Sequence, residues 1–114
     1  MVEYTDNRLS ILLKAVSDAT RRSLLTLLCQ QGTTRVTDLA QVYDMSLNAV
    51  SKHIKVLEKA GLVRRETIGR THWIAADMTQ TAEIEEWFKS LKSIWVLRLD
   101  SLDELINKGD NKND

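Results

Sequence analysis

The segment from Ser46 to Lys59 carries side chains that suit hydrogen bonding to DNA bases and phosphates. Its apolar residues Val50, Ile54 and Leu57 are four and then three positions apart, which is the spacing of one buried helix face. Ser46 can cap the helix by accepting a bond from a free backbone N–H group. The outward positions hold small, polar or basic residues, as in a helix that enters the major groove. We expect DNA contacts from this segment at Ser46, Asn48, Ala49, Ser51, Lys52, His53 and Lys55.

These side chains have different expected partners. Asn48 can pair with adenine through two hydrogen bonds, and Lys52 can reach guanine acceptors or a phosphate. The alternative for the whole set is a solvated helix face. His53 has an alternative of its own, because it can pack against the preceding turn as a structural histidine.

A second basic segment follows this helix, and its pattern predicts two short strands over 62–68 and 71–75. Gly69 and Arg70 between them indicate a two-residue hairpin turn. Strand alternation sends Arg64 and Arg65 to opposite faces, so only one of them is expected to reach DNA. Arg21 and Arg22 have an equally weighted alternative, as partners of Asp18 or of an adjacent helix end. Outside the first segment, the expected DNA contacts are Arg65, Arg70, Thr71, Arg21, Arg22 and Thr37.

The elements that position these residues are mostly helical. A short helix, which Thr37 can cap, and a longer helix are joined by a turn of about three residues, which is helix-turn-helix spacing. The fold class that we predict is therefore mainly α with a small β-hairpin wing, a winged helix-turn-helix. We expect one domain over 1–107, with helix-turn-helix about 37–60, wing about 62–76, long terminal helices about 6–16 and 78–106, and a disordered tail at 108–114.

The charge is balanced overall but segregated along the chain. Among 114 residues, 16 are Lys or Arg and 16 are Asp or Glu, which excludes a uniformly basic chromatin-type protein. Residues 46–72 contain six basic and two acidic side chains, whereas residues 77–114 contain five basic and nine acidic ones. We therefore expect a basic surface for DNA around 46–72 and an acidic distal part.

Several other classes of protein are excluded by residue content. One Cys excludes an intrachain disulfide framework and a multi-Cys zinc site, and Cys29, beside Leu27 and Leu28, is expected to be a buried, inert thiol. No apolar run reaches membrane-spanning length and no secretory signal is present, so a cytoplasmic location is expected. Both His residues lie in the predicted DNA-binding segments without a nucleophile nearby, so we expect neither an enzyme nor a cofactor.

The resemblance to a known family is carried by the runs Ser51-Lys52-His53-Ile54-Lys55-Val56-Leu57 and Ala60-Gly61-Leu62-Val63, by Asp18-Ala19-Thr20-Arg21-Arg22, and by Gly69-Arg70. Over roughly residues 8–106 the chain closely resembles the ArsR family of bacterial repressors. The terminal helix is similar to that of a subgroup without known metal sites. The family's thiolate pair would fall at Arg35-Val36-Thr37-Asp38, which lacks Cys, and residues 77–106 lack the His of a second family site. We therefore expect no transition-metal site.

The terminal helix has a wide apolar stripe, more than a small monomer is expected to cover. The resemblance implies that it pairs with the first helix and a symmetry mate to form a homodimer, so the operator should be an imperfect inverted repeat. The expected interface residues are Leu9, Leu12, Leu13, Val16, Trp87, Leu91, Ile94, Trp95, Leu102 and Leu105.

Two other functions remain open from the sequence. One is a repressor whose DNA affinity responds to a thiol modification or to a small ligand. The other is a winged-helix protein-interaction module without DNA binding. Such modules usually lack cations on the second helix and wing, whereas this chain has Lys52, Lys55 and Arg70 there.

Overall fold

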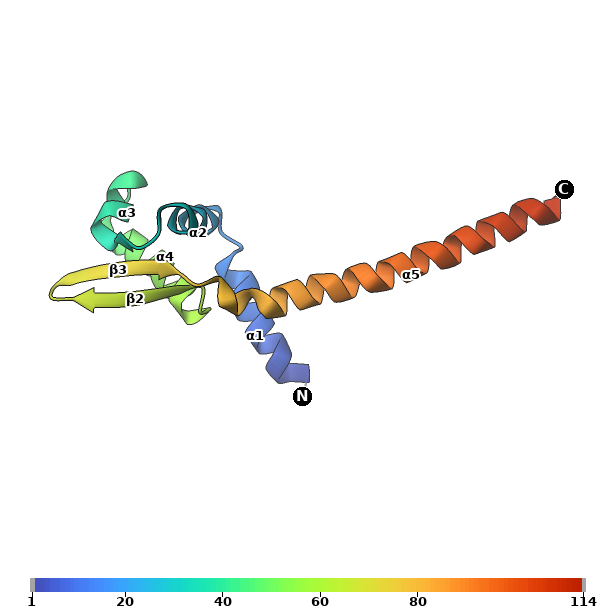
Figure 1. Cartoon of the computed structure of the whole chain (residues 1–114), viewed down its shortest axis with the longest axis horizontal. Coiled ribbons are helices and arrows are strands. Elements are labelled where there is room, and N and C mark those ends of the chain that lie inside the picture. Colours follow the sequence, from blue (N-terminus) through green and yellow to red (C-terminus); the bar gives the residue numbers. More distant parts are fainter. Residues whose placement is uncertain (1, 114) are drawn as a thin grey trace. The chain divides into compact units, whose positions relative to one another are not determined.

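The computed structural model describes the backbone of residues 2–113 and the side chains of residues 7–107. The chain divides into two compact units, residues 1–83 and residues 84–114. The elements, coloured along the chain in Figure 1, are α1 (Val2–Ala15), α2 (Ala19–Gln31), β1 (Thr34–Arg35), α3 (Val36–Val42), α4 (Leu47–Lys59), β2 (Val63–Ile68), β3 (Thr71–Ala76), a 3₁₀ turn (Met78–Thr81) and α5 (Ala82–Asn113). The predicted winged helix-turn-helix order is confirmed.

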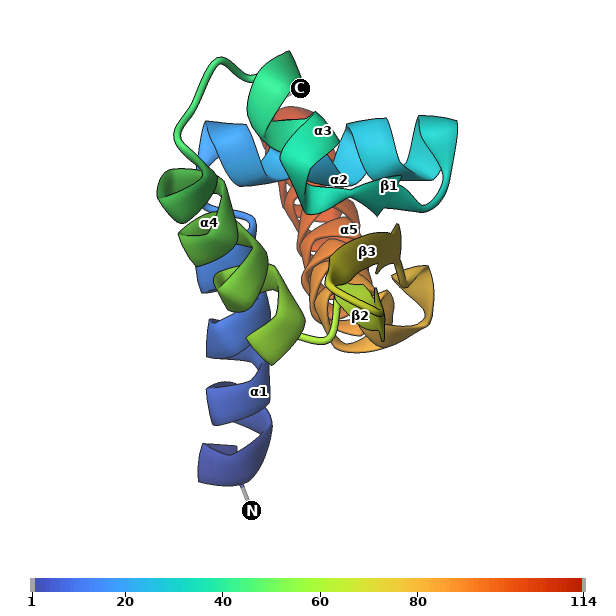
Figure 2. The ribbon, with the colours of Figure 1, turned by 90° about the vertical axis from the view of Figure 1, so that its left-hand side faces the viewer.

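The core of the first unit is built from one face of each helix and from the sheet. Val50, Ile54 and Leu57 of α4 are fully buried, as their spacing predicts. The other buried side chains include Leu12, Ala15, Leu24, Leu28, Val36, Leu39, Leu62, Val63 and Ile74. The C-terminal half of α1 lies beside α4 in this unit (Figure 2). The prediction that Leu12 belongs to a dimer interface is corrected, because its side chain is 0% exposed within its own domain.

The wing belongs to a three-stranded antiparallel sheet with the order β1-β3-β2. Ile68 pairs with Thr71 across the two-residue turn, so the predicted hairpin is confirmed. The two-residue strand β1 was not predicted, because two residues show no alternation. It pairs Thr34 with Ile74 and leads directly into α3, so the wing is joined to the helix-turn-helix.

The helix-turn-helix is formed by α3 and α4. Ser46 caps α4 by accepting a hydrogen bond from the Ala49 backbone N–H at 3.1 Å, as predicted. The expectation that Thr37 caps α3 is wrong: that helix begins at Val36, and its N-cap residue Arg35 makes no side-chain capping bond. Between the helices, Asp44 has a left-handed backbone, with φ 49°, which turns the chain without a glycine.

The second unit consists almost entirely of α5, which carries exposed apolar side chains along its described length. The first predicted turn of this helix is instead the 3₁₀ turn Met78–Thr81, capped by Asp77. Trp87, Leu91, Ile94, Trp95, Leu102 and Leu105 are all between 39% and 67% exposed. The backbone of α5 continues to Asn113, so most of the segment expected as a disordered tail at 108–114 is helical, and its side chains lie outside the described ones. None of the helices in the described part combines the length and apolar character needed to cross a bilayer.

Gly61, after α4, has φ +76°, and a Cβ there would lie 3.1 Å from Gln80 Cγ and 3.3 Å from Arg8 Nη2. Gly69 also has a positive φ, but a Cβ there would meet no atom within 4 Å. We expect Gly61→Ala to lower the free energy of unfolding by about 2 kcal/mol and Gly69→Ala by only about 1 kcal/mol. Urea unfolding measures both, and equal losses would contradict the crowding at Gly61.

Candidate nucleic-acid interface

The outward face of α4 is polar and accessible because its opposite face is buried. Asn48, Lys52 and Lys55 are exposed, and Ala49 and Ser51 are half-buried. The Ser46 cap leaves the first turn of α4 at the protein surface. This arrangement places side chains that read base edges and contact phosphates on one side of a single helix.

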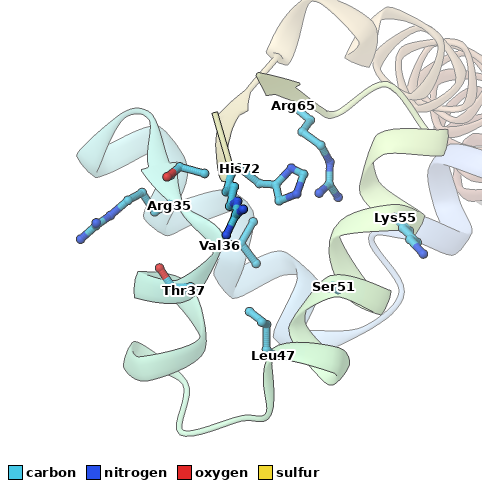
Figure 3. Close-up of a pocket in the computed structure, with 10 residues that line it drawn as sticks. Arg35, Val36, Thr37, Leu47, Ser51, Lys55, Arg65 and His72 are labelled. Carbon is cyan, nitrogen blue, oxygen red and sulfur yellow. The ribbon is translucent and has the colours of Figure 1, made fainter. Parts of the chain in front are cut away.

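A hollow of about 470 Å³ lies between the start of α3, α4 and the wing. Figure 3 shows Ser51 on α4, Thr37 and Val36 at the start of α3, and Arg65 and His72 on the wing around it. The lining residues are Arg35, Val36, Thr37, Leu47, Ser51, Lys55, Arg65, Arg70, Thr71 and His72. The structure thus brings together six predicted contacts from three parts of the sequence: Thr37, Ser51, Lys55, Arg65, Arg70 and Thr71.

Leu47 is a residue of this surface that the sequence analysis missed. It is the first residue of α4, it lines the hollow, and its side chain is 52% exposed. Leu47 stands three positions before Val50 and continues the apolar spacing of the helix, so no signal in the sequence indicated that it would be exposed. An apolar group at this position suits contact with a thymine methyl or a deoxyribose.

The cations at this surface differ in whether an acidic partner neutralises them. Among the side chains that the structure describes, none forms an ion pair with Lys52, Lys55 or Arg70. Arg35, in contrast, donates to both carboxylate oxygens of Asp38, at 2.9 and 3.2 Å. The unpaired charges therefore lie on α4 and at the wing tip, where two elements meet around the hollow.

Arg65 has a different role from the predicted DNA contact. It donates from Nη2 to Glu58 Oε1 at 2.8 Å and from Nε to Oε2 at 3.2 Å, with its side chain only 24% exposed. Arg65 pairs with Ile74 across the sheet, so it points to the helix side, whereas Arg64 is 74% exposed. The expected alternation is confirmed, but the inward arginine is engaged by Glu58 and joins the wing to α4.

Arg21 and Arg22 contact the end of α1, which was their alternative role. Arg21 donates from Nε to the Ala15 carbonyl at 2.7 Å and from Nη2 to the Lys14 carbonyl at 2.9 Å. Arg22 donates from Nη1 to the Val16 carbonyl at 2.7 Å. These carbonyls are the ones that a helix end leaves without intrahelical partners.

His53 is likewise held within the domain. Its Nδ1 lies 3.2 Å from Arg21 Nη1 and 3.9 Å from Asp18 Oδ2, and its side chain is 22% exposed. The packing alternative for His53 therefore describes this structure. Asp18 caps α2 by accepting from the Arg21 backbone N–H at 3.1 Å, and this bond, together with the positive charge of Arg21, lowers the pKa of Asp18 below its ordinary value of 3.8.

The start of α3 does not fit a thiophilic metal. Arg35 and Asp38 satisfy one another there, Val36 is buried, and the Arg35 guanidinium lies 5.9 Å from the centre of the Trp73 ring. Within the described side chains, no three His, Cys, Asp or Glu residues lie close enough together to hold a metal ion. A fixed guanidinium and a single carboxylate offer no thiolate or imidazole ligand.

The prediction of a buried Cys29 is wrong, because its side chain is exposed. The buried residues of α2 are Leu24 and Leu28, four positions apart on one face. Cys29 is one residue beyond Leu28, about 100° around the helix, and so lies outside the buried stripe. The run of leucines made the whole segment look buried, although only one face of it is.

Comparisons with known proteins agree with this geometry. A sequence model described as "Helix-turn-helix domain" matches residues 16–66. The Arsenical resistance operon repressor of Bacillus subtilis (strain 168) is 38% identical over 56 residues, which are 49% of this chain and 53% of that protein. The chain thus spans about half the length of that relative.

Two further relatives match over most of their length. The Transcriptional repressor SdpR of Bacillus subtilis (strain 168) is 28% identical over 98 residues, covering 86% of this chain and 92% of that protein. The crystal structure of an ArsR family transcriptional regulator is 31% identical with a TM-score of 0.74, covering 79% of this chain and 92% of that chain.

The Asp18 cap predicts a pH dependence of stability. Because the folded-state pKa is lowered, the charged cap stabilises the fold above the unfolded-state pKa, and this contribution is lost as pH falls through the folded-state pKa. Asp18→Ser keeps an uncharged cap and is the matched variant. We expect the difference in urea midpoint between the two proteins to be constant from about pH 7 to 5 and to change in favour of the variant below about pH 4. A difference that stays constant down to pH 3 would contradict this assignment.

Proposed function

The chain belongs to the ArsR family of transcriptional regulators, and we propose that it is a metal-independent repressor that binds an inverted-repeat operator as a homodimer. The observation that carries the proposal is the group of unpaired cations, Lys52, Lys55 and Arg70, on two elements that flank one hollow. A surface that binds a polyanion needs positive charge that the protein's own carboxylates do not neutralise.

In this proposal α4 enters the major groove. Asn48 and Lys52 face the base edges, and exposed Leu47 contacts a thymine methyl group. The hollow beside α4 receives the sugar-phosphate backbone, with Thr37 on α3, Lys55 on α4, and Arg70 and Thr71 on the wing around it. The backbone contacts position the protein, and the α4 contacts supply sequence preference.

We infer that α5 and α1 form the dimer interface. The apolar side chains of α5 that we assign to it are exposed in the single chain, Trp95 by 59% and Leu105 by 67%. Leu9, Leu13 and Val16 are half-buried and still accessible, and they supplement the interface in place of buried Leu12. Two-fold symmetry then spaces the half-sites by roughly 34 Å or a multiple of it.

The remaining parts of the proposal follow from the residues available. The start of α3 holds an arginine-carboxylate pair, so repression requires no metal ion there. We assign the chain no catalytic activity. A regulator that acts on chromosomal DNA in a bacterium works in the cytoplasm, which is the location we propose.

The DNA-binding surface can be tested with matched alanine variants. We expect Lys52→Ala and Arg70→Ala each to weaken binding to upstream promoter DNA about tenfold. Each should also reduce the slope of log affinity against log salt concentration by about one. Lys59→Ala removes an exposed cation from the far end of α4 and should change affinity less than twofold. Fluorescence anisotropy between about 50 and 200 mM salt measures both quantities. Unchanged affinity in the first two variants would remove this site assignment.

The dimer can be tested in the full chain with two substitutions on α5. Leu91 lies on the apolar stripe, whereas Leu97 is 68% exposed but about 120° away from Leu91 around the helix. We expect Leu91→Glu to convert the dimer to monomer at micromolar concentration, because a carboxylate would be buried unpaired. Leu97→Glu is the control and should leave the sedimentation coefficient unchanged. A wild-type protein that sediments as a monomer would refute the dimer.

A further inference from the structure

One guanidinium group, that of Arg21, connects three helices of the first unit. Arg21 belongs to α2, its Nε and Nη2 donate to the Ala15 and Lys14 carbonyls of α1, and its Nη1 lies 3.2 Å from His53 Nδ1 of α4. The first two bonds are 2.7 and 2.9 Å long. The side chain of its neighbour Arg22 donates only to the carbonyl of Val16, the first residue after α1.

The chemistry of the group explains why one residue can make all three contacts. A guanidinium carries five N–H donors in a rigid plane and stays charged at any physiological pH. Because Arg21 can only donate, His53 Nδ1 must be the acceptor in this contact, which leaves the proton of the neutral ring on Nε2. The contact therefore fixes both the ring orientation and the tautomer of a residue in the middle of α4.

We propose that Arg21 is the positioning residue through which the dimer interface sets the direction of α4. This inference rests on the proposed function, in which α1 belongs to the dimer interface and α4 enters the DNA. The α1 end is held by Arg21, and α4 is held by the same rigid group through His53. Arg21 then fixes the position of each α4 relative to the dimer interface, and so sets the distance between the two α4 helices. The protein therefore discriminates between operators by their half-site spacing.

The test separates loss of positioning from loss of stability. The probe is a duplex that the wild-type full chain enriches from a random-sequence library, together with duplexes carrying one or two base pairs inserted between its half-sites. Arg21→Lys keeps the charge but loses the planar set of donors. Arg22→Lys is the matched control, because it also alters a contact to the end of α1 but none to α4.

For the wild type and Arg22→Lys, we expect insertion of base pairs to weaken binding at least tenfold. For Arg21→Lys, we expect this penalty to fall to about twofold while the dimer, measured by sedimentation, is retained. A stability defect alone would weaken binding to all duplexes equally. The proposal is overturned if inserted base pairs weaken the binding of Arg21→Lys as much as they weaken that of the wild type. It is also overturned if this spacing penalty falls in Arg22→Lys as much as in Arg21→Lys.

A second pair of variants changes His53, the α4 residue in this contact, and keeps the test available if Arg21→Lys does not fold. His53→Asn keeps an acceptor near the position of Nδ1 and should retain the spacing penalty, whereas His53→Leu should lose it. Ring ¹⁵N shifts of the wild type should show the Nε2–H tautomer, and the Nδ1–H tautomer would overturn the contact. If the wild type enriches no duplex, the proposed function fails. If it enriches one and only the spacing results disagree, this inference alone fails.

Discussion

The burial of Val50, Ile54 and Leu57 is the constraint on which the DNA-facing surface depends. All three are 0% exposed, so α4 has one permitted rotation about its own axis. That rotation turns Asn48, Lys52 and Lys55 away from the core, because they lie on the opposite side of a helix with 3.6 residues per turn. Apolar packing thus decides which polar residues the protein presents, although the packed residues themselves touch no ligand.

The distribution of ion pairs refines this surface. Glu58, Asp38 and Glu83 pair with Arg65, Arg35 and Arg8, and each of these pairs fixes one element against another or closes a helix end. The arginines used in this way contribute little free charge to a ligand. On α4 and at the wing tip, Lys52, Lys55 and Arg70 have no carboxylate partner among the described side chains, so the balanced composition of the whole chain coexists with a locally positive face.

The sequence predicts well what depends on local chemistry. The Ser46 cap, the Gly69–Arg70 turn and the buried face of α4 follow from residue type and spacing, and the structure agrees with each. Features that depend on distant partners were not predictable in the same way. For Arg21 and His53 the sequence left open DNA contact or packing within the domain, because the choice depends on the end of α1 lying beside α4, which no spacing in the sequence reveals.

The prediction errors have physical causes of the same kind. Cys29 was assigned to the core because Leu27 and Leu28 precede it directly, but only one face of α2 is buried. Leu12 was assigned to the interface with a second subunit, but its side chain is already buried within its own domain.

The short strand β1 has a consequence for how fast this protein can bind. Because β1 pairs with Trp73 and Ile74 of β3 and runs directly into α3, the base of the wing has a strand on both sides of β3 and is not a free hairpin. A loop that must be ordered on binding costs conformational entropy and slows productive encounter. Here that ordering is present before the ligand arrives, so a collision that aligns α4 also aligns the wing. The association rate should then be governed by diffusion and electrostatic attraction rather than by a folding step.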